Sequence, residues 1–335
     1  MRKLSDTLER LGAFADLYWG LGIDGTSHPL IDLKNFGTNP GALRAKCYVP
    51  ANLPPNAPLV VVLHGCKQAA GGYNRGSGWS DLAERYGFAV LFPEQQRLNN
   101  PNLCFNWYRE GDTRRDMGEA LSIRQMVEKI VIQEGLDRRR IYIAGLSAGG
   151  AMVSAMLATY PDVFAGGAII AGLAYGSART IPEAFDRMRG HGGPPEEALQ
   201  AFVRDASTHE GPWPIVSVWH GGNDPTVEAT NMKTIVAQWR KVHRLQKKPT
   251  HIDVVDGYPH RVWRNNEGRD CIETYTITGM GHGTPLDTLR GDRYGAIGAY
   301  MLEAGISSTF HIARFWGLTQ SLRGAAIRPV REIAA

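Results

Sequence analysis

The stretch IYIAGLSAGGAM, residues 141–152, decides how this chain can fold. Apolar and β-branched residues run up to Gly145, Ser147 follows two positions later, and small residues come after it. This order predicts a buried strand that turns sharply into a helix, with the serine of G-x-S-x-G on the turn. Backbone N–H groups at the start of that helix point toward any negative charge that develops beside the serine. Since the chain has 39 glycines, the pattern needs support from its surroundings.

Strands and helices alternate on both sides of this turn. Apolar strands are expected at 29–37, 42–50, 57–65, 88–94, 140–145, 165–172, 214–221 and 271–283. Helical spacing predicts helices at 78–87, 118–135, after Ser147, at 228–243 and at 305–318. A hairpin arm is expected at 251–265. The alternation predicts an α/β fold with a mostly parallel central sheet and helices on both faces.

The chain divides into one large domain with flanking segments. Residues 1–40 are expected to form an amphipathic helix and an arm, 41–320 a single catalytic domain, and 321–335 a tail. The alternation stops within 175–212, where two short helices surround a Gly-Pro break. We expect this insertion to form a small helical cap over the site, with an ordinary surface excursion as the alternative.

Composition excludes several classes of protein. With 335 residues, 43% hydrophobic and 21% charged, the chain can bury a large core. The net charge of +4 comes without a Lys/Arg run or a zinc-finger spacing, so we expect no nucleic-acid partner. No apolar run is long enough to span a membrane, and no signal peptide is visible, which on sequence alone favours the cytoplasm. The four cysteines form no C-x-x-C pair, so we expect no metal site.

A serine nucleophile needs a base and an acid, which in such sheets follow it in the order acid, histidine. His282, in the glycine-rich loop after the last core strand, is the best base among ten histidines. Asp224, after the strand 214–221, is the best acid. The less suitable candidates are His64, His220, His251 and His260 for the base, and Asp253 and Asp256 for the acid.

An oxyanion formed at Ser147 also needs hydrogen-bond donors. The N–H of Ala148, directly after the serine, is one candidate. The N–H of Cys66, in the loop LHGCKQ after the strand 57–65, is the second. Three aromatic residues are expected to shape the substrate site, although Trp219 has a core position as its alternative: Trp107, Tyr175 and Trp219.

With these pieces placed, the chain resembles the poly(3-hydroxybutyrate) depolymerase family of esterases, a branch of the α/β-hydrolases. The resemblance spans roughly residues 35–285 and is carried by VVLHGCKQ, NLCFNWY, IYIAGLSAGGAM, VSVWHGGNDPTV and GMGHG. It implies secretion and a disulfide between Cys66 and Cys104, with two buried free thiols as the alternative. Cys47 and Cys271 are expected to be free. The resemblance also implies the same nucleophile, acid, base and oxyanion donors that the residues themselves indicate.

The resulting hypothesis is a cofactor-independent serine esterase that forms an acyl-enzyme. The substrate is expected to be a neutral ester, either a 3-hydroxybutyrate oligomer or polyester or a short-chain ester. Acetyl or feruloyl esters of plant polysaccharide remain an alternative, as do a peptidase or acyltransferase with the same triad. A non-catalytic binding protein on the same scaffold is the alternative from another class. The oligomeric state is left open.

Overall fold

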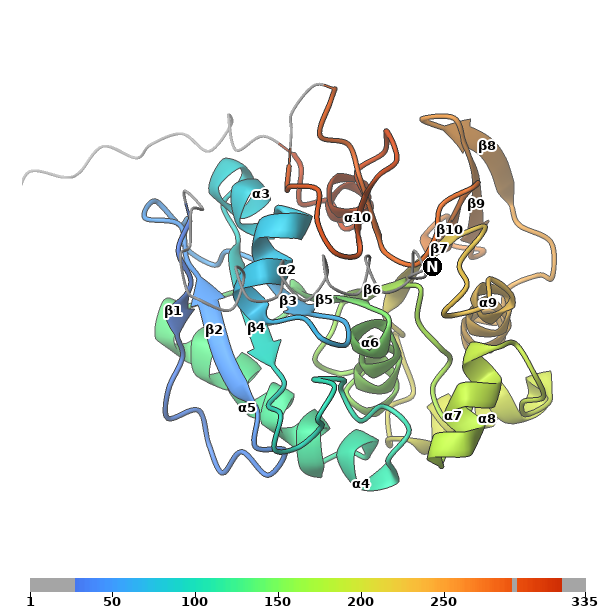
Figure 1. Ribbon diagram of the computed structural model, residues 1–335, viewed down its shortest axis with the longest axis horizontal. Helices are drawn as coiled ribbons and strands as arrows, with labels where there is room; N and C mark the ends of the chain where they lie inside the picture. Colours follow the sequence, from blue (N-terminus) through green and yellow to red (C-terminus); the bar gives the residue numbers. More distant parts are fainter. Residues whose placement is uncertain (1–27, 291–293, 321–335) are drawn as a thin grey trace, which may run out of the picture.

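A ten-stranded sheet lies at the centre of the computed structural model, which describes residues 28–290 and 294–320 (Figure 1). Its central strands are mutually parallel and lie in the order β4 (Ala89–Glu94), β3 (Leu59–Leu63), β5 (Ile141–Leu146), β6 (Gly166–Ile170), β7 (Ile215–Gly221) and β10 (Asp270–Ile277). The antiparallel strands β2 (Arg44–Tyr48) and β1 (Ile31–Asp32) extend one edge. The other edge carries the predicted hairpin arm, β9 (Tyr258–Arg264) and β8 (His251–Val255).

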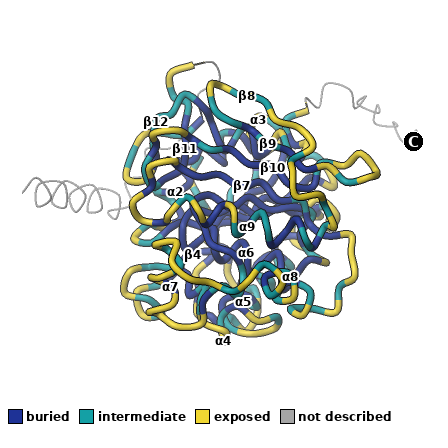
Figure 2. The backbone as a smooth tube through the Cα atoms, turned by 90° about the vertical axis from the view of Figure 1, so that its right-hand side faces the viewer, coloured by how far each residue is buried: buried dark blue, intermediate teal, exposed yellow. Residues whose placement is uncertain are grey.

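Alternation along the buried strands builds two apolar layers. In β3, Leu59, Val61 and Leu63 face one layer, whereas Val60 and Val62 face the other. The first layer packs against α5 (Gly118–Glu134), α6 (Ala148–Thr159), α8 (Glu196–Asp205) and α9 (Thr230–Val242). The second packs against α2 (Ala70–Ser77), α3 (Trp79–Tyr86) and α10 (Ser308–Phe315). Helices therefore cover both faces, as predicted, and Figure 2 shows the central strands in the buried interior.

The predicted insertion contains two helices, α7 (Ile181–Met188) and α8. Both lie at the same end of the molecule as the short α4 (Glu110–Thr113) in Figure 1. A small parallel sheet of β11 (Thr284–Leu286) and β12 (Met301–Glu303), which the sequence did not reveal, follows β10. The helix expected near the N-terminus and the tail 321–335 lie outside the described residues.

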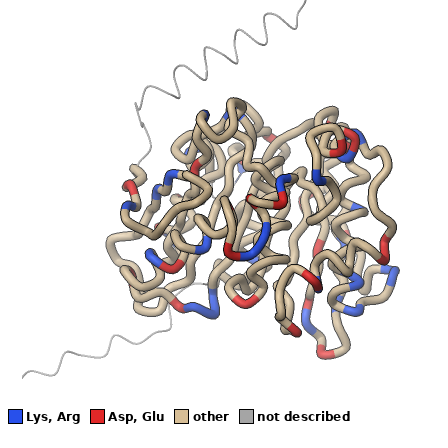
Figure 3. The backbone as a smooth tube through the Cα atoms, turned by 90° about the horizontal axis from the view of Figure 1, so that it is seen from below, with Lys and Arg blue, Asp and Glu red and all other residues tan. Residues whose placement is uncertain are grey.

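Charged residues of both signs are intermingled along the backbone (Figure 3). Within 28–290 and 294–320, no helix has the length and apolarity needed to cross a membrane.

Candidate active site

Ser147 lies on a sharp turn between β5 and α6, as its sequence pattern predicts. Its backbone has φ 57° and ψ −119°, a conformation that L-residues rarely adopt. The flanking glycines allow this turn to form. A Cβ on Gly145 would lie 2.6 Å from the backbone of Gly149, and one on Gly149 would lie 2.5 Å from the carbonyl oxygens of Leu63 and His64. Small residues are therefore a steric requirement of this turn.

Asp224 and His282 form a hydrogen-bonded pair on loops that follow β7 and β10. His282 Nδ1 and Asp224 Oδ2 are 2.7 Å apart, so the protonated Nδ1 donates to the carboxylate. The backbone N–H groups of Thr226 and Val227 donate to Asp224 Oδ1 at 2.8 and 2.9 Å. Burial raises the pKa of Asp224, but the His282 contact and these two N–H groups outweigh it, so this pKa lies below its ordinary value.

The rival acids lie elsewhere. Asp253 contacts His260 Nδ1 at 2.6 Å, and Asp256 contacts His311 Nε2 at 2.8 Å. Both belong to the hairpin arm, which is why neither reaches the loop of His282.

Two buried histidines support the loops around the site, a role that sequence reasoning did not assign. Gln95 N–H donates to His64 Nε2 at 3.1 Å, so the Nδ1–H of His64 donates to the carbonyl of Gly65 at 2.7 Å. His220 Nε2–H donates to Val227 O at 2.8 Å and lies 3.6 Å from Asp224 Oδ2. Burial lowers the pKa of both histidines. The sequence feature that could have indicated this role is the same for both: each histidine directly precedes a glycine at the end of a strand.

The loop after β3 carries Cys66, which lines the same cavity as Ser147 and Ala148. The Cys66–Cys104 disulfide confirms the predicted pairing, and Cys47 and Cys271 are free. Lys67, at φ 61°, donates its backbone N–H to Asn102 O at 2.7 Å, which ties this loop to the Cys104 segment. Within the described part of the chain, no acceptor takes a hydrogen bond from the N–H of Cys66 or Ala148.

A buried carboxyl group that sequence reasoning missed anchors the Cys104 segment. Glu119, near the start of α5, accepts hydrogen bonds from Gln95 Nε2 at 2.6 Å and from Asn106 N and Nδ2 at 2.9 and 2.7 Å. Gln95 Nε2 also donates to Cys104 O at 3.0 Å. Burial, with a contribution from Asp112, raises the pKa of Glu119 to about 8 despite these hydrogen bonds.

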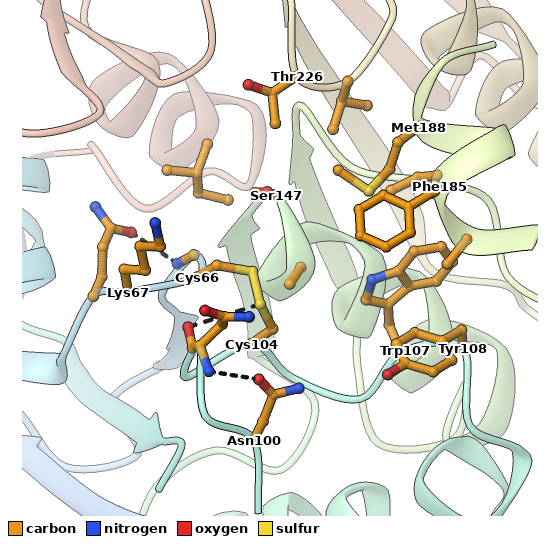
Figure 4. A pocket seen from close by; sticks show the side chains of 18 of the residues that line it. Cys66, Lys67, Asn100, Cys104, Trp107, Tyr108, Ser147, Phe185, Met188 and Thr226 are labelled. Atoms are coloured by element: carbon orange, nitrogen blue, oxygen red, sulfur yellow. Dashed lines mark hydrogen bonds between the residues drawn. A yellow bond between two sulfur atoms is a disulfide. The ribbon is translucent and has the colours of Figure 1, made fainter. Parts of the chain in front are cut away.

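Ser147 and His282 line one cavity of about 620 Å³ (Figure 4). Cys66, Ala148 and Trp107 line it too, so it brings together most of the residues expected at the site. Much of its remaining wall is apolar, from Leu146, Leu173, Ile181, Phe185, Met188 and Val227. Ile181, Phe185 and Met188 are on α7, and Val227 is in the loop that carries Asp224.

Two of the expected substrate residues lie outside this cavity. Trp219 is fully buried in β7, stacked on Tyr275 of the paired strand β10 with ring centroids 3.8 Å apart. The expectation that it contacts substrate is therefore wrong, and it is a core residue. Tyr175 lines a second, adjoining cavity together with Trp107.

The described residues offer no evident metal centre. In 28–290 and 294–320, no three His, Cys, Asp or Glu side chains gather closely enough to hold a metal ion.

Comparison with known proteins places relatives of this chain among the esterases. The model of the family Esterase PHB depolymerase matches residues 45–249. Poly(3-hydroxyalkanoate) depolymerase C of Paucimonas lemoignei is 45% identical over 293 residues, which cover 87% of this chain and 70% of that protein. An acetylxylan esterase of Coprinopsis cinerea is 30% identical over 263 residues, 76% of this chain and 69% of that protein.

The fold has a close counterpart among solved structures. An acetyl xylan esterase from Aspergillus awamori superposes with a TM-score of 0.72 at 22% identity, covering 87% of this chain and 99% of its own. This likeness identifies the fold as that of an α/β-hydrolase. The chain is a serine carboxylic ester hydrolase and belongs to the Esterase PHB depolymerase family.

Proposed function

We propose that this esterase hydrolyses oligomers of 3-hydroxyalkanoates through an acyl-enzyme on Ser147, with His282 as base and Asp224 as acid. The observation that carries the proposal is the 2.7 Å contact between His282 Nδ1 and Asp224 Oδ2. His282 lines the same cavity as Ser147. That contact fixes the tautomer in which Nε2 is free to accept a proton.

The reaction then follows from these positions. His282 Nε2 takes the proton of Ser147 Oγ as the oxygen attacks the ester carbonyl carbon, and Asp224 stabilises the resulting imidazolium. The N–H groups of Cys66 and Ala148 donate to the oxyanion. Collapse breaks the bond to the alcohol oxygen, which receives the proton from His282. Water then attacks the acyl-enzyme by the same route and releases the acid and the free serine.

The substrate class rests on two supports. The poly(3-hydroxyalkanoate) depolymerase is more similar in sequence than the acetylxylan esterase. The apolar wall with Phe185 and Met188 suits an aliphatic hydroxyacyl chain better than a sugar, whose hydroxyl groups need polar partners. Acetyl and feruloyl esters of polysaccharide form the second candidate class, because relatives with those activities share the chain's sequence pattern.

The disulfide supports a proposal about compartment. A bond between Cys66 and Cys104 persists in an oxidising environment and is rare in a reducing cytosol. We therefore place the working enzyme outside the reducing cytosol.

A panel of esters tests the substrate class. Purified enzyme is assayed on 3-hydroxybutyrate oligomers, p-nitrophenyl acetate, acetylated xylan fragments and methyl ferulate, with Ser147→Ala as the blank. The proposal predicts the highest kcat/KM for the hydroxybutyrate oligomers. A preference for acetylated xylan fragments or the ferulate would move the enzyme to the second class, and turnover of amides in preference to esters would refute the esterase assignment.

A further inference from the structure

A second cavity of about 470 Å³ adjoins the cavity of Ser147. Trp107 and Tyr108 line both cavities, and their rings meet edge to face with centroids 5.7 Å apart. Figure 4 shows these two side chains together at one side of the first cavity, below Phe185. The two cavities therefore meet at this aromatic pair.

The second cavity is built on a fixed backbone. Tyr175 N–H donates to Gln238 Oε1 at 3.1 Å, and Gln238 Nε2 donates to Tyr175 O and to Leu199 O, each at 2.9 Å. Gln238 is fully buried, so it ties the Tyr175 segment and α8 to α9. Tyr175 and Phe202 line this cavity together with Trp107, so its lining is rich in aromatic residues.

Three arginines line this cavity, and one of them lacks an ion-pair partner. Arg115 makes a bidentate pair with Asp162 at 2.6 and 3.0 Å, and Arg114 pairs with Glu110. Arg179 lies over the Phe202 ring at 5.9 Å, and its backbone N–H donates to Glu183 Oε2 at 2.8 Å. Within the described residues, no carboxylate forms an ion pair with its guanidinium. Its exposed guanidinium can therefore bind an incoming anion at small desolvation cost.

The electrostatics at Tyr175 are consistent with this arrangement. Burial raises the pKa of the Tyr175 hydroxyl, and the positive charges of Arg114 and Arg179 oppose that rise, whereas Glu110 adds to it. Asp205 also lines the cavity and is exposed, so it weakens the attraction for an anion. Asp162 neutralises Arg115 and Glu110 neutralises Arg114, so the lining charges outside these ion pairs are those of Arg179 and Asp205.

We propose that the second cavity binds the free carboxylate of the leaving alcohol, with Arg179 as its cationic contact. This inference rests on the proposed function, because it follows from the chemistry of a hydroxyacid oligomer. When an internal ester of such an oligomer is cleaved, the alcohol fragment carries the chain's free carboxyl end. The scissile ester stays neutral in the first cavity, while the distant carboxylate selects chains that end a short way beyond it.

The test compares one oligomer in two forms. Initial rates on the 3-hydroxybutyrate trimer are measured with its carboxyl end free and with the same end methylated, and the ratio of the two kcat/KM values is the readout. Wild type is expected to favour the free acid. Arg179→Gln should lower the ratio about fivefold to tenfold, and Arg179→Lys, which keeps the positive charge, should lower it less. Asp205→Asn should raise the ratio.

Controls separate this effect from general damage. Arg139→Gln removes another exposed arginine, which precedes β5 and so lies at the opposite end of the strands, and it should leave the ratio unchanged. Hydrolysis of p-nitrophenyl acetate, which has no distant carboxylate, should be the same in all these variants. The preference for the free acid should also shrink as salt screens the contact.

The outcomes distinguish this inference from the proposed function. If the trimer is hydrolysed but Arg179→Gln and Asp205→Asn leave the ratio at its wild-type value, the carboxylate does not bind here, although the oligomer hydrolase stands. If no trimer is hydrolysed, titration calorimetry measures trimer binding to Ser147→Ala. The site is supported if Ser147→Ala binds the free acid more tightly than the methyl ester and Ser147→Ala/Arg179→Gln loses this difference. Equal binding of the two forms overturns it.

Discussion

At the scale of single residues, Ser147 shows how sequence and backbone constrain each other. Its φ of 57° is costly for a residue with a Cβ, on the order of 1–3 kcal/mol, and it persists because the turn between β5 and α6 is held on both sides. The backbone N–H of Ser147 donates to Ile170 O at 2.9 Å, which ties the turn to β6. The G-x-S-x-G pattern predicted this turn because its glycines satisfy a local steric need.

Gly149→Ala should disrupt the turn. Its Cβ would lie 2.5 Å from the backbone oxygens of Leu63 and His64, which cannot move without shifting the Cys66 loop. We expect kcat on p-nitrophenyl acetate to fall about 10²-fold or more, because small displacements of reacting groups cost that much. Gly71→Ala, on α2 with open space around it, is the matched control and should retain full activity. Normal turnover by Gly149→Ala would show that the turn tolerates displacement.

Trp107→Ala should slow the hydrolysis of long substrates more than that of short ones. The indole lines both cavities, so its removal takes a wall from any chain that spans them. We expect the transition state for a hydroxybutyrate oligomer to lose about 1–2 kcal/mol of stabilisation, which lowers kcat/KM accordingly. The loss on p-nitrophenyl acetate should be smaller. Equal losses on both substrates would mean that Trp107 supports the fold instead.

At the scale of elements, β7 shows where sequence reasoning succeeded and where it failed. The apolar run 214–221 predicted a buried strand that delivers Asp224 to the site, and β7 does so. The sequence could not say which face of β7 Trp219 would occupy, because that depends on its neighbour in β10. Tyr275 is directly opposite Trp219 in the parallel register, and the two rings stack in the core.

The disulfide predicts how many thiols the protein exposes to a reagent. Cys47 and Cys271 are buried, and burial raises the pKa of Cys47 to about 11, so the native protein should react slowly with a thiol reagent. Denatured without reductant, it should show two thiols per chain. A count of four in an aerobically purified sample would refute the Cys66–Cys104 bond.

The raised pKa of Glu119 predicts how the stability of the protein depends on pH. Its pKa is raised from 4.5 to about 8, so the folded state holds this proton more tightly than the unfolded state. The stabilisation is complete below about pH 4.5 and is lost as the pH rises toward 8. Urea unfolding at several pH values should therefore show a negative contribution to the slope of the unfolding free energy over this window.

Glu119→Gln should flatten that slope while lowering overall stability. The amide keeps the size of the side chain but places an N–H donor against an N–H of Asn106 or Gln95, at a cost of about 1–3 kcal/mol. Glu197→Gln, on the exposed face of α8, serves as the control and should leave the slope unchanged. A variant with the wild-type slope would show that Glu119 is ionised throughout.

At the scale of the whole molecule, the predictable part of the structure is the part fixed by local pattern. Runs such as LVVVL at 59–63 and the alternation of strands with helices predicted the parallel core, the hairpin arm and the strand-end positions of Ser147, Asp224 and His282. The small sheet of β11 and β12 escaped prediction because its three-residue strands carry little signal.

Features that depend on tertiary neighbours could not be predicted. The second cavity exists because α4, the Tyr175 segment and α8 meet, and these elements lie far apart in the sequence. The supporting roles of Glu119 and His220 depend in the same way on what surrounds them after folding. A local sequence pattern does not indicate which distant segments will come into contact.

The central claim is that Ser147 is the nucleophile activated by His282 and Asp224, and covalent labelling tests it most directly. The folded enzyme is treated with a fluorophosphonate and its mass and peptide map are recorded. The account predicts one adduct per chain, on the peptide that contains Ser147, absent from Ser147→Ala. Labelling should be slower by about three orders of magnitude or more in Asp224→Asn and His282→Ala. An adduct on another residue, or near-normal ester hydrolysis by Ser147→Ala, would contradict the account.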